Sequence, residues 1–215
     1  MLGNWSLGEY YKRETITWSF EFLTSPRWLN LDPGRIYVTV FEGDADAPRD
    51  LESVAIWQEA YQSRGIEASF NERIFAYPKD KNWWGPAGMT GPCGPDTEIF
   101  WDTGRTHDMR YGASCHPNCD CGRFIEIWNN VFMEYNKTPS ATFEPLAQKN
   151  VDTGMGLERV VAVLQGKSTV FETENFVAIL EEIQKISGVT YEPSDDVPLH
   201  YSGSVGVGVV HDLEA

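Results

Sequence analysis

The sequence predicts an α+β fold, a sheet with helices packed beside it, for a chain of 215 residues. Long β-branched and aromatic runs, typical of strands, are separated by amphipathic segments typical of helices. The two kinds of segment do not alternate regularly, as they would in a doubly wound parallel sheet. Hydrophobic residues make up 41% of the chain and aromatic residues 13%, which is enough apolar surface for a buried core.

Apolar residues recur at helical spacing in four segments. In the first of them, Tyr11, Trp18 and Phe22 lie on one side, and Ser25 and Pro26 end the pattern. The predicted helices are residues 9–24, 51–62, 154–165 and 174–186.

Three runs rich in β-branched and aromatic residues are predicted to be strands, at residues 35–41, 96–102 and 124–135. Residues 79–95 are dense in Gly and Pro, which predicts a loop. In the third strand the odd positions are apolar except for Asn129. A polar side chain in an apolar row needs a hydrogen-bond partner or a ligand, and partners from the backbone are the commoner solution.

The charge balance is strongly acidic, with 17 Lys and Arg against 32 Asp and Glu and a net charge of −15. This argues against a surface that holds nucleic acid by neutralising phosphates. The first residues do not form a signal peptide, and no apolar run is long enough to span a membrane. The 4 Cys, three of them in residues 115–121, are not a secreted disulfide framework. We therefore expect a cytoplasmic protein without a membrane partner.

One short segment, residues 151–159, combines groups that suit an ammonium and a phosphate. Asp152 can pair with an ammonium, and Arg159 can hold a phosphate through two hydrogen bonds. Gly154 and Gly156 allow a ligand to approach the backbone at the start of a helix. The alternative interpretation is that Asp152 caps the helix and Arg159 lies on a solvated face.

This segment, VDTGMGLERV, resembles motif 3 of the class II aminoacyl-tRNA synthetases in the form found in the alanyl-tRNA synthetase family. MLGNWSLGEYYKRETI resembles the second half of motif 2, and RIYVTVFEGD, NWWGPAGMTGPCGPDTEIF and RFIEIWNNVFMEYNK match intervening segments in the same order. The resemblance covers residues 1–198, a partial aminoacylation catalytic domain. Residues 199–215 resemble nothing in the family and are expected to be a divergent tail.

The resemblance implies an antiparallel sheet flanked by helices and a two-step ligase reaction. Alanine and ATP would form alanyl-adenylate with release of pyrophosphate, and the alanyl group would pass to tRNA(Ala). Catalysis would depend on positioning and on neutralising phosphate charge, with Mg²⁺ as the usual metal. ATP and Mg²⁺ are thus the implied cofactors.

The resemblance also implies roles for particular residues. Arg159 corresponds to the catalytic motif 3 arginine on the ATP phosphates, and Asp152 to the carboxylate that binds the alanine ammonium. The remaining implied contacts with substrate are Trp84, Asn129 and Val131 at the amino-acid pocket, Gly154 and Gly156 beside the adenylate, and Met1 near the adenine.

The sequence departs from the family at both ends. It starts inside motif 2, so the domain is expected to be incomplete at its N-terminus, without motif 1 and the motif 2 arginine. The regions that grip tRNA(Ala) have no counterpart here. We therefore expect the isolated chain to form alanyl-adenylate poorly. Two alternatives stay open: a non-catalytic paralogue that binds alanine or adenylate, and one half of a split synthetase.

Cys115, His116, Cys119 and Cys121 gather three thiols and an imidazole within residues 115–121. These groups suit Zn²⁺, with His116 or the more distant Cys93 as the fourth ligand. The spacing is not that of a standard paired zinc knuckle. The alternative is a surface loop with free cysteines in a reducing compartment.

Overall fold

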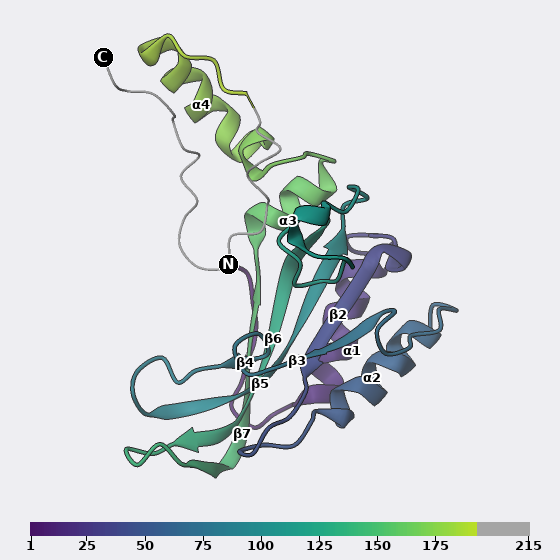
Figure 1. The fold of residues 1–215 in the computed structure, drawn as a ribbon, viewed down its shortest axis with the longest axis vertical. Helices are drawn as coiled ribbons and strands as arrows, with labels where there is room; N and C mark the ends of the chain where they lie inside the picture. Colours follow the sequence, from purple (N-terminus) through teal and green to yellow (C-terminus); the bar gives the residue numbers. More distant parts are fainter. Residues whose placement is uncertain (193–215) are drawn as a thin grey trace.

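The computed structural model describes residues 1–192, which form a seven-stranded mixed sheet with helices on one face and at one end (Figure 1). The strand order is β1-β7-β6-β5-β2-β3, and β4 pairs with β5 outside this path. The pairs are antiparallel except for β2 with β3, which run parallel. The expected α+β class and antiparallel sheet are therefore confirmed, with one parallel pair at the edge.

The strands are β1 (Trp5–Ser6), β2 (Ile36–Phe41), β3 (Ile74–Tyr77), β4 (Trp83–Trp84), β5 (Gly91–Asp102), β6 (Phe124–Lys137) and β7 (Phe143–Met155). The helices are α1 (Lys12–Thr24), α2 (Leu51–Gln62), α3 (Leu157–Leu164) and α4 (Glu174–Ser187). Three single 3₁₀ turns accompany them: η1 (Pro33–Arg35), η2 (Met109–Tyr111) and η3 (Val170–Glu172). The expected tail, residues 199–215, lies outside the described residues.

The four predicted helices and three predicted strands are confirmed, but three boundaries were wrong. The first helix starts at Lys12 instead of residue 9. The segment predicted as a loop contains β4 and the first residues of β5, because Gly94 has no side chain to collide with the Phe132 carbonyl on β6. The third predicted helix starts at Leu157 instead of residue 154, because β7 runs on to Met155. The short β1 and β3 and the long β7 were not predicted either.

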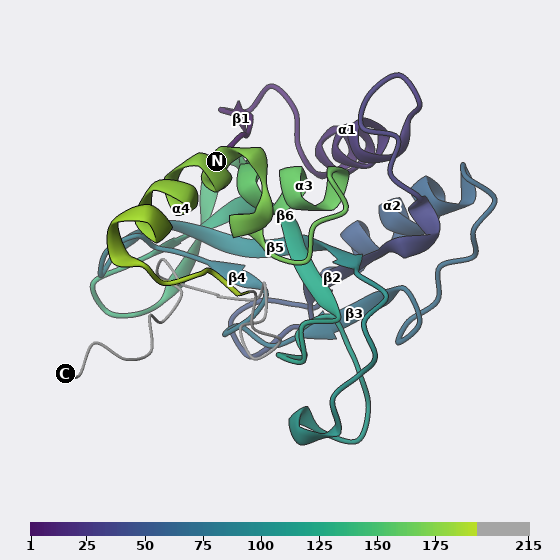
Figure 2. The ribbon, with the colours of Figure 1, turned by 90° about the horizontal axis from the view of Figure 1, so that it is seen from above.

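One face of the sheet packs against α1 and α2 (Figure 2). Phe20 of α1 lies between Trp57 and Tyr61 of α2, with ring centroids 5.9 and 5.0 Å away. The polar tips of these rings reach the sheet, since Trp57 Nε1 donates to Thr97 Oγ1 at 2.8 Å and the Tyr61 hydroxyl donates to the Ile36 carbonyl at 2.8 Å. We call this the helix face.

A β-bulge in β5–β6 changes which side chains of β6 share a face. Ile125 pairs with Trp101 and Trp128 pairs with Ile99, with a register shift between the two pairs. Ile125 and Trp128, three residues apart, thus both point to the helix face, and both belong to the main hydrophobic core. Asn129 therefore points to the face opposite Ile125. The prediction of one apolar row interrupted by Asn129 was wrong, because a bulge shifts the two-residue alternation by one.

Within residues 1–192, none of the helices is both long and apolar enough to cross a membrane.

Candidate functional site

The face of the sheet opposite α1 and α2 carries two rows of side chains that cross β5, β6 and β7. In the first row, Val131 of β6 pairs with Asp96 of β5 on one side and with Asp152 of β7 on the other. In the second row, Asn129 pairs with Glu98 and with Gly154. Paired residues in antiparallel strands share a face, so all of these residues lie on one surface.

We call this surface, defined by Asp96, Glu98, Glu126, Asn129 and Asp152, the carboxylate face. The backbones of Asp96 and Asp152 are two strand spacings apart, roughly 10 Å. Val131 lies between them and is 5% exposed. The two carboxylates therefore flank one small, apolar side chain.

Asp96 is buried and bound by two asparagines. Its Oδ1 accepts a hydrogen bond from Asn82 Nδ2 at 2.9 Å, and its Oδ2 accepts one from Asn129 Nδ2 at 3.4 Å. Burial raises the pKa of Asp96 to about 7, with a smaller contribution from the charge of Glu126. Within the described residues, the buried Oδ1 atoms of Asn82 and Asn129 have no hydrogen-bond partner. Asn129 thus offers an unused acceptor on the carboxylate face.

Glu98 and Glu126 add further negative charge beside Asp96. Burial raises the pKa of Glu98 well above its usual value, and the charges of Asp96 and Glu126 raise it further. Glu126 is paired with Arg159, whose Nη1 donates to Glu126 Oε2 at 2.8 Å and to the Glu126 carbonyl at 2.9 Å. A face with this many carboxylates favours a cationic ligand.

The structure argues against the alternative in which Asp152 caps the helix and Arg159 lies on a solvated face. The Arg159 side chain is 24% exposed and turns back to the sheet instead of into solvent. Asp152 lies within β7, and the residue that caps α3 is Gly156. Burial raises the pKa of Asp152, while a hydrogen bond from the Trp5 side chain acts in the opposite direction.

The N-terminus runs beside the end of β7. Leu2 exchanges backbone hydrogen bonds with Met155, and a Cβ on Gly3 would overlap the Thr153 carbonyl, so this approach requires glycine. A Cβ on Gly154 would overlap the Met1 sulfur, so the Met1 side chain lies against Gly154. Gly156 donates its N–H to the Ile127 carbonyl at 3.0 Å, which joins the start of α3 to β6.

The structure thus brings together most of the residues predicted from the sequence. The residues on or beside the two rows are Met1, Asn129, Val131, Asp152 and Gly154, with Gly156 and Arg159 at the adjoining start of α3. Trp84 lies on β4, where its backbone pairs with Gly94, two residues before Asp96. It is 36% exposed.

Sequence reasoning missed the carboxylates of Asp96, Glu98 and Glu126. Asp96 and Glu98 occupy alternate positions at the start of a predicted strand, which places both on one face. That alternation was the available signal. Glu126 shares this face because of the register of β5 with β6. Asn82 reaches Asp96 because the segment that carries β4 folds against β5.

The cysteine cluster has a different fourth member from the one expected. The side chains of His107, Cys115, Cys119 and Cys121 have their ligand atoms within 4.8 Å of one another. His116 Nδ1 is instead 2.7 Å from the Tyr77 hydroxyl on β3. Cys93 is buried in β5. Neither His116 nor Cys93 belongs to the group that the structure brings together, because their side chains are turned to other parts of the fold.

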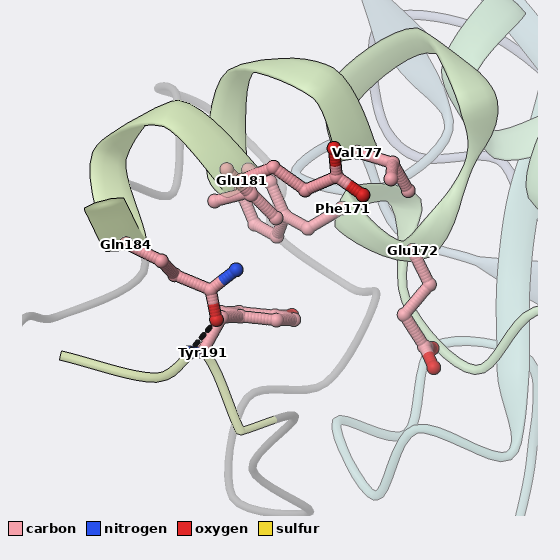
Figure 3. A pocket seen from close by; sticks show the side chains of 7 residues that line it. Phe171, Glu172, Val177, Glu181, Gln184 and Tyr191 are labelled. Atoms are coloured by element: carbon pink, nitrogen blue, oxygen red, sulfur yellow. Dashed lines mark hydrogen bonds between the residues drawn. The ribbon is translucent and has the colours of Figure 1, made fainter. Parts of the chain in front are cut away.

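A separate hollow lies between η3, α4 and Tyr191, beyond the end of the sheet (Figure 3). The Tyr191 N–H donates to Gln184 Oε1 at 2.6 Å, and the Phe171 and Tyr191 rings are 6.3 Å apart. None of the predicted site residues belongs to its lining. The carboxylate face is therefore the candidate for chemistry.

Comparison with known proteins gives the family of the chain. The family model described as tRNA synthetases class II (A) matches residues 1–202. An alanine–tRNA ligase of Treponema denticola is 55% identical over 191 residues, which is 89% of this chain and 30% of that protein. An alanine–tRNA ligase of Treponema pallidum is 52% identical over 191 residues, again 89% of this chain and 30% of that protein.

A more distant relative extends the match further along the chain. An alanine–tRNA ligase of Petrotoga mobilis is 43% identical over 212 residues, 99% of this chain and 22% of that protein. The chain thus spans less than a third of the length of these relatives. The matched residues include both rows of the carboxylate face and the start of α3, and the chain belongs to the class II (A) family of tRNA synthetases.

Proposed function

We propose that the carboxylate face binds alanine and ATP for the formation of alanyl-adenylate, as part of an alanine–tRNA ligase. The observation that carries this proposal is the first row, in which Asp96 and Asp152 flank Val131, next to the unpaired acceptor of Asn129. The names of the relatives support alanine as the amino acid.

The amino-acid end of the site is built for a small zwitterion. Asp152 accepts the α-ammonium, and Asn129 Oδ1, which has no partner within residues 1–192, is a second acceptor on the same face. Val131 forms the floor under the alanine methyl, and Trp84 closes the pocket from β4. Because one methyl group offers little binding energy, such a pocket selects alanine mainly by excluding larger side chains.

The nucleotide end of the site lies where β7 meets α3. Gly154 and Gly156 let the adenylate approach the backbone, and Met1 lies against Gly154 at the position proposed for the adenine. Arg159 binds the phosphates as the catalytic cation, in exchange for part of its pairing with Glu126. The carboxylate of alanine attacks the α-phosphate in line, and pyrophosphate leaves.

The carboxylates of Glu98 and Glu126 suit Mg²⁺, which prefers oxygen ligands. Glu98 lies beside Asp96 and Glu126; burial first, and then the charges of these two neighbours, raise the pKa of Glu98, and a bound cation would oppose that shift. When bound, Mg²⁺ neutralises phosphate charge. Arg159 would hold the phosphates directly in the orientation for in-line attack, and Glu98 and Glu126 would act on them only by holding the Mg²⁺. Transfer to tRNA(Ala), through parts of the ligase outside this chain, and a cytoplasmic location are further parts of this proposal.

Calorimetric titration with a non-hydrolysable alanyl-adenylate analogue tests the site directly. We expect the 215-residue chain to bind the analogue and Asp152→Asn to weaken binding at least tenfold. Glu144→Gln is the matched control, because Glu144 is an exposed carboxylate near the far end of the same strand. Equal affinity of Asp152→Asn and the unaltered chain would contradict the proposed role of Asp152.

Alanine-dependent exchange of pyrophosphate into ATP tests whether the isolated chain is active. We expect exchange far below the rate of an intact alanine–tRNA ligase measured in parallel, with analogue binding retained. Exchange near the intact rate would contradict this expectation. Binding with no exchange at all would favour the non-catalytic paralogue.

A further inference from the structure

The connection between β5 and β6, residues 103–123, is long and has almost no core of its own. In Figure 2 this segment, in teal, extends away from the sheet and carries the short turn η2. Its largest apolar side chains are exposed, with Met109 at 68% and Tyr111 at 44%. Connections this long without regular structure are uncommon in compact domains and need a source of order other than apolar packing.

The two ends of this connection are fixed to each other. Arg123 Nη2 donates to Asp102 Oδ2 at 2.8 Å, and Thr103 N–H donates to the Arg123 carbonyl at 2.8 Å. These contacts close the base of the connection but do not order the residues that extend from it. Within this part of the chain, the remaining cluster of interacting side chains is His107, Cys115, Cys119 and Cys121.

The spacing of these four side chains matches a tetrahedral metal site. Cys115 Sγ and Cys121 Sγ are 3.5 Å apart, and Cys119 Sγ is 3.8 Å from His107 Nδ1. With zinc–sulfur bonds of about 2.3 Å and zinc–nitrogen bonds of about 2.0 Å, neighbouring ligands in a tetrahedron are roughly 3.5–3.8 Å apart. All four ligand atoms lie within 4.8 Å of one another, so small side-chain adjustments complete the geometry.

We propose that His107, Cys115, Cys119 and Cys121 bind one structural Zn²⁺ that orders residues 103–123. Three thiolates and one imidazole are a ligand set that suits Zn²⁺. Because four protein ligands fill the tetrahedron, no position is left for a catalytic water or a substrate. Because zinc binding releases the thiol protons, the affinity for Zn²⁺ rises with pH.

The ion links the start of the connection, at His107, to its end, at Cys121, and so shortens the freely moving part. Such a cross-link stabilises the folded state mainly by reducing the conformational freedom of the unlinked chain. It also fixes the position of His116, which contacts Tyr77 on β3. Zinc would thereby attach the connection to the sheet edge beside the carboxylate face.

The competing chemistry is a disulfide between Cys115 and Cys121, the two closest sulfurs. It would use two of the four clustered groups and leave Cys119 and His107 without a role. The two possibilities differ in metal content, which makes them separable by experiment.

The first test measures metal content in the 215-residue chain, purified with a reducing agent and without chelators or added zinc. We expect about one equivalent of Zn²⁺ in the unaltered chain. Cys119→Ser and His107→Ala should each lower zinc affinity at least tenfold. Cys93→Ser and His116→Ala are matched controls, a cysteine and a histidine outside the cluster, and should keep about one equivalent.

Less than a tenth of an equivalent in the unaltered chain would overturn the proposal, as would loss of zinc in Cys93→Ser equal to that in Cys119→Ser. Loss of zinc in His116→Ala but not in His107→Ala would overturn the assignment of the fourth ligand. If a variant does not fold, Co²⁺ titration of the metal-stripped, unaltered chain replaces it. We expect tetrahedral cobalt bands with thiolate charge transfer at one equivalent; their absence would count against the site.

The second test measures the effect on the connection. The Arg110 side chain is 72% exposed within it and offers a tryptic cleavage site. Removing zinc with a chelator under reducing conditions should increase the rate of cleavage after Arg110 at least tenfold. An unchanged rate, with zinc present beforehand, would show that the ion does not order this segment and would overturn that part of the proposal.

Discussion

Both faces of the sheet bury carboxylates, but they balance the charge differently. On the helix face, the 5% exposed side chain of Lys12 lies 2.8 Å from Asp50 and 3.2 Å from Glu134, and Lys149 pairs with Glu134 at 2.7 Å. On the carboxylate face, Asp96 is bound by the neutral amides of Asn82 and Asn129. The buried carboxylates of the helix face are thus paired with cations of the chain itself. Asp96, Glu98 and Asp152 on the other face form no ion pair within residues 1–192, so a ligand cation would favour their ionised forms.

This contrast distinguishes buried charges that stabilise the fold from buried carboxylates that could bind a ligand. Removing a partner from a balanced buried group leaves an uncompensated charge and destabilises the fold. Removing a carboxylate from an unbalanced face relieves repulsion and desolvation, and so stabilises the fold while reducing ligand binding. Substitutions of these charged residues are therefore expected to lower the free energy of unfolding on the helix face and to raise it on the carboxylate face.

The largest effect is expected on the helix face. Lys12→Met leaves the buried Asp50 carboxylate without a cationic partner, while Glu134 keeps its pair with Lys149, and this should lower the free energy of unfolding by about 3–5 kcal/mol. Denaturation in urea measures this. Arg13→Met is the control, because the two side chains of its ion pair with Glu59 are 60% exposed, so solvent screens the pair and its loss should change stability little. Equal losses in the two variants would contradict the comparison.

The second effect is on the carboxylate face and has the opposite sign. Burial raises the pKa of Asp96 to about 7, above an unfolded value of about 3.9. The unfolded chain therefore loses this proton first, and the contribution of Asp96 to stability falls as the pH rises from about 4 to about 7. Asp96→Asn should stabilise the fold at pH 8 by roughly 2–4 kcal/mol, and hardly at all near pH 4.

Unfolding of Asp96→Asn in urea across this pH range checks the sign. Asp102→Asn is a control with the reverse behaviour. Burial alone would raise the pKa of Asp102, but hydrogen bonds from Arg123 hold this pKa below its usual value. The contribution of Asp102 is present above the unfolded pKa and is lost as the pH falls through the folded one. A pH-independent effect of Asp96→Asn would argue that Asp96 is ionised throughout.

The smallest effect uses two adjacent asparagines that point to opposite faces. Both have an Oδ1 without a partner among residues 1–192, but Asn129 Nδ2 donates to Asp96 on the carboxylate face at 3.4 Å, whereas Asn130 Nδ2 donates to Ser19 on α1 at 3.2 Å. Asn129→Leu should change stability by less than about 1 kcal/mol and lower affinity for the alanyl-adenylate analogue about tenfold. Asn130→Leu should lower stability by about 1 kcal/mol and leave affinity unchanged. The reverse pattern would show that the ligand is bound elsewhere.

Several features of this site could be predicted from the sequence because they depend on short-range patterns. Asp152, Gly154, Gly156 and Arg159 lie within eight positions of one another and carry a recognisable combination of charges and glycines. The amphipathic spacing of α2 and α4 also fixed their limits to within one residue. Local hydrophobic periodicity predicts an element well when no contact with a distant segment changes its limits.

Other features depend on contacts between distant segments. β7 could not be predicted because much of it is polar and exposed near the sheet edge, so it lacks a strand-like hydrophobic pattern. The sequence also could not show which residue joins the three cysteines of the cluster. His116 is adjacent to Cys115 in sequence, but folding brings His107 to the thiols and turns His116 to Tyr77.

The sequence by itself determined the α+β class, the family and the chemistry available at residues 151–159, because these depend on composition, local spacing and motif order. Only the tertiary structure decided that Asp96, Glu98 and Glu126 share a face with Asn129 and Asp152. The physical reason is strand register: pairing across β5, β6 and β7, together with one bulge, determines which side chains face each other. No pattern within a single strand contains that information.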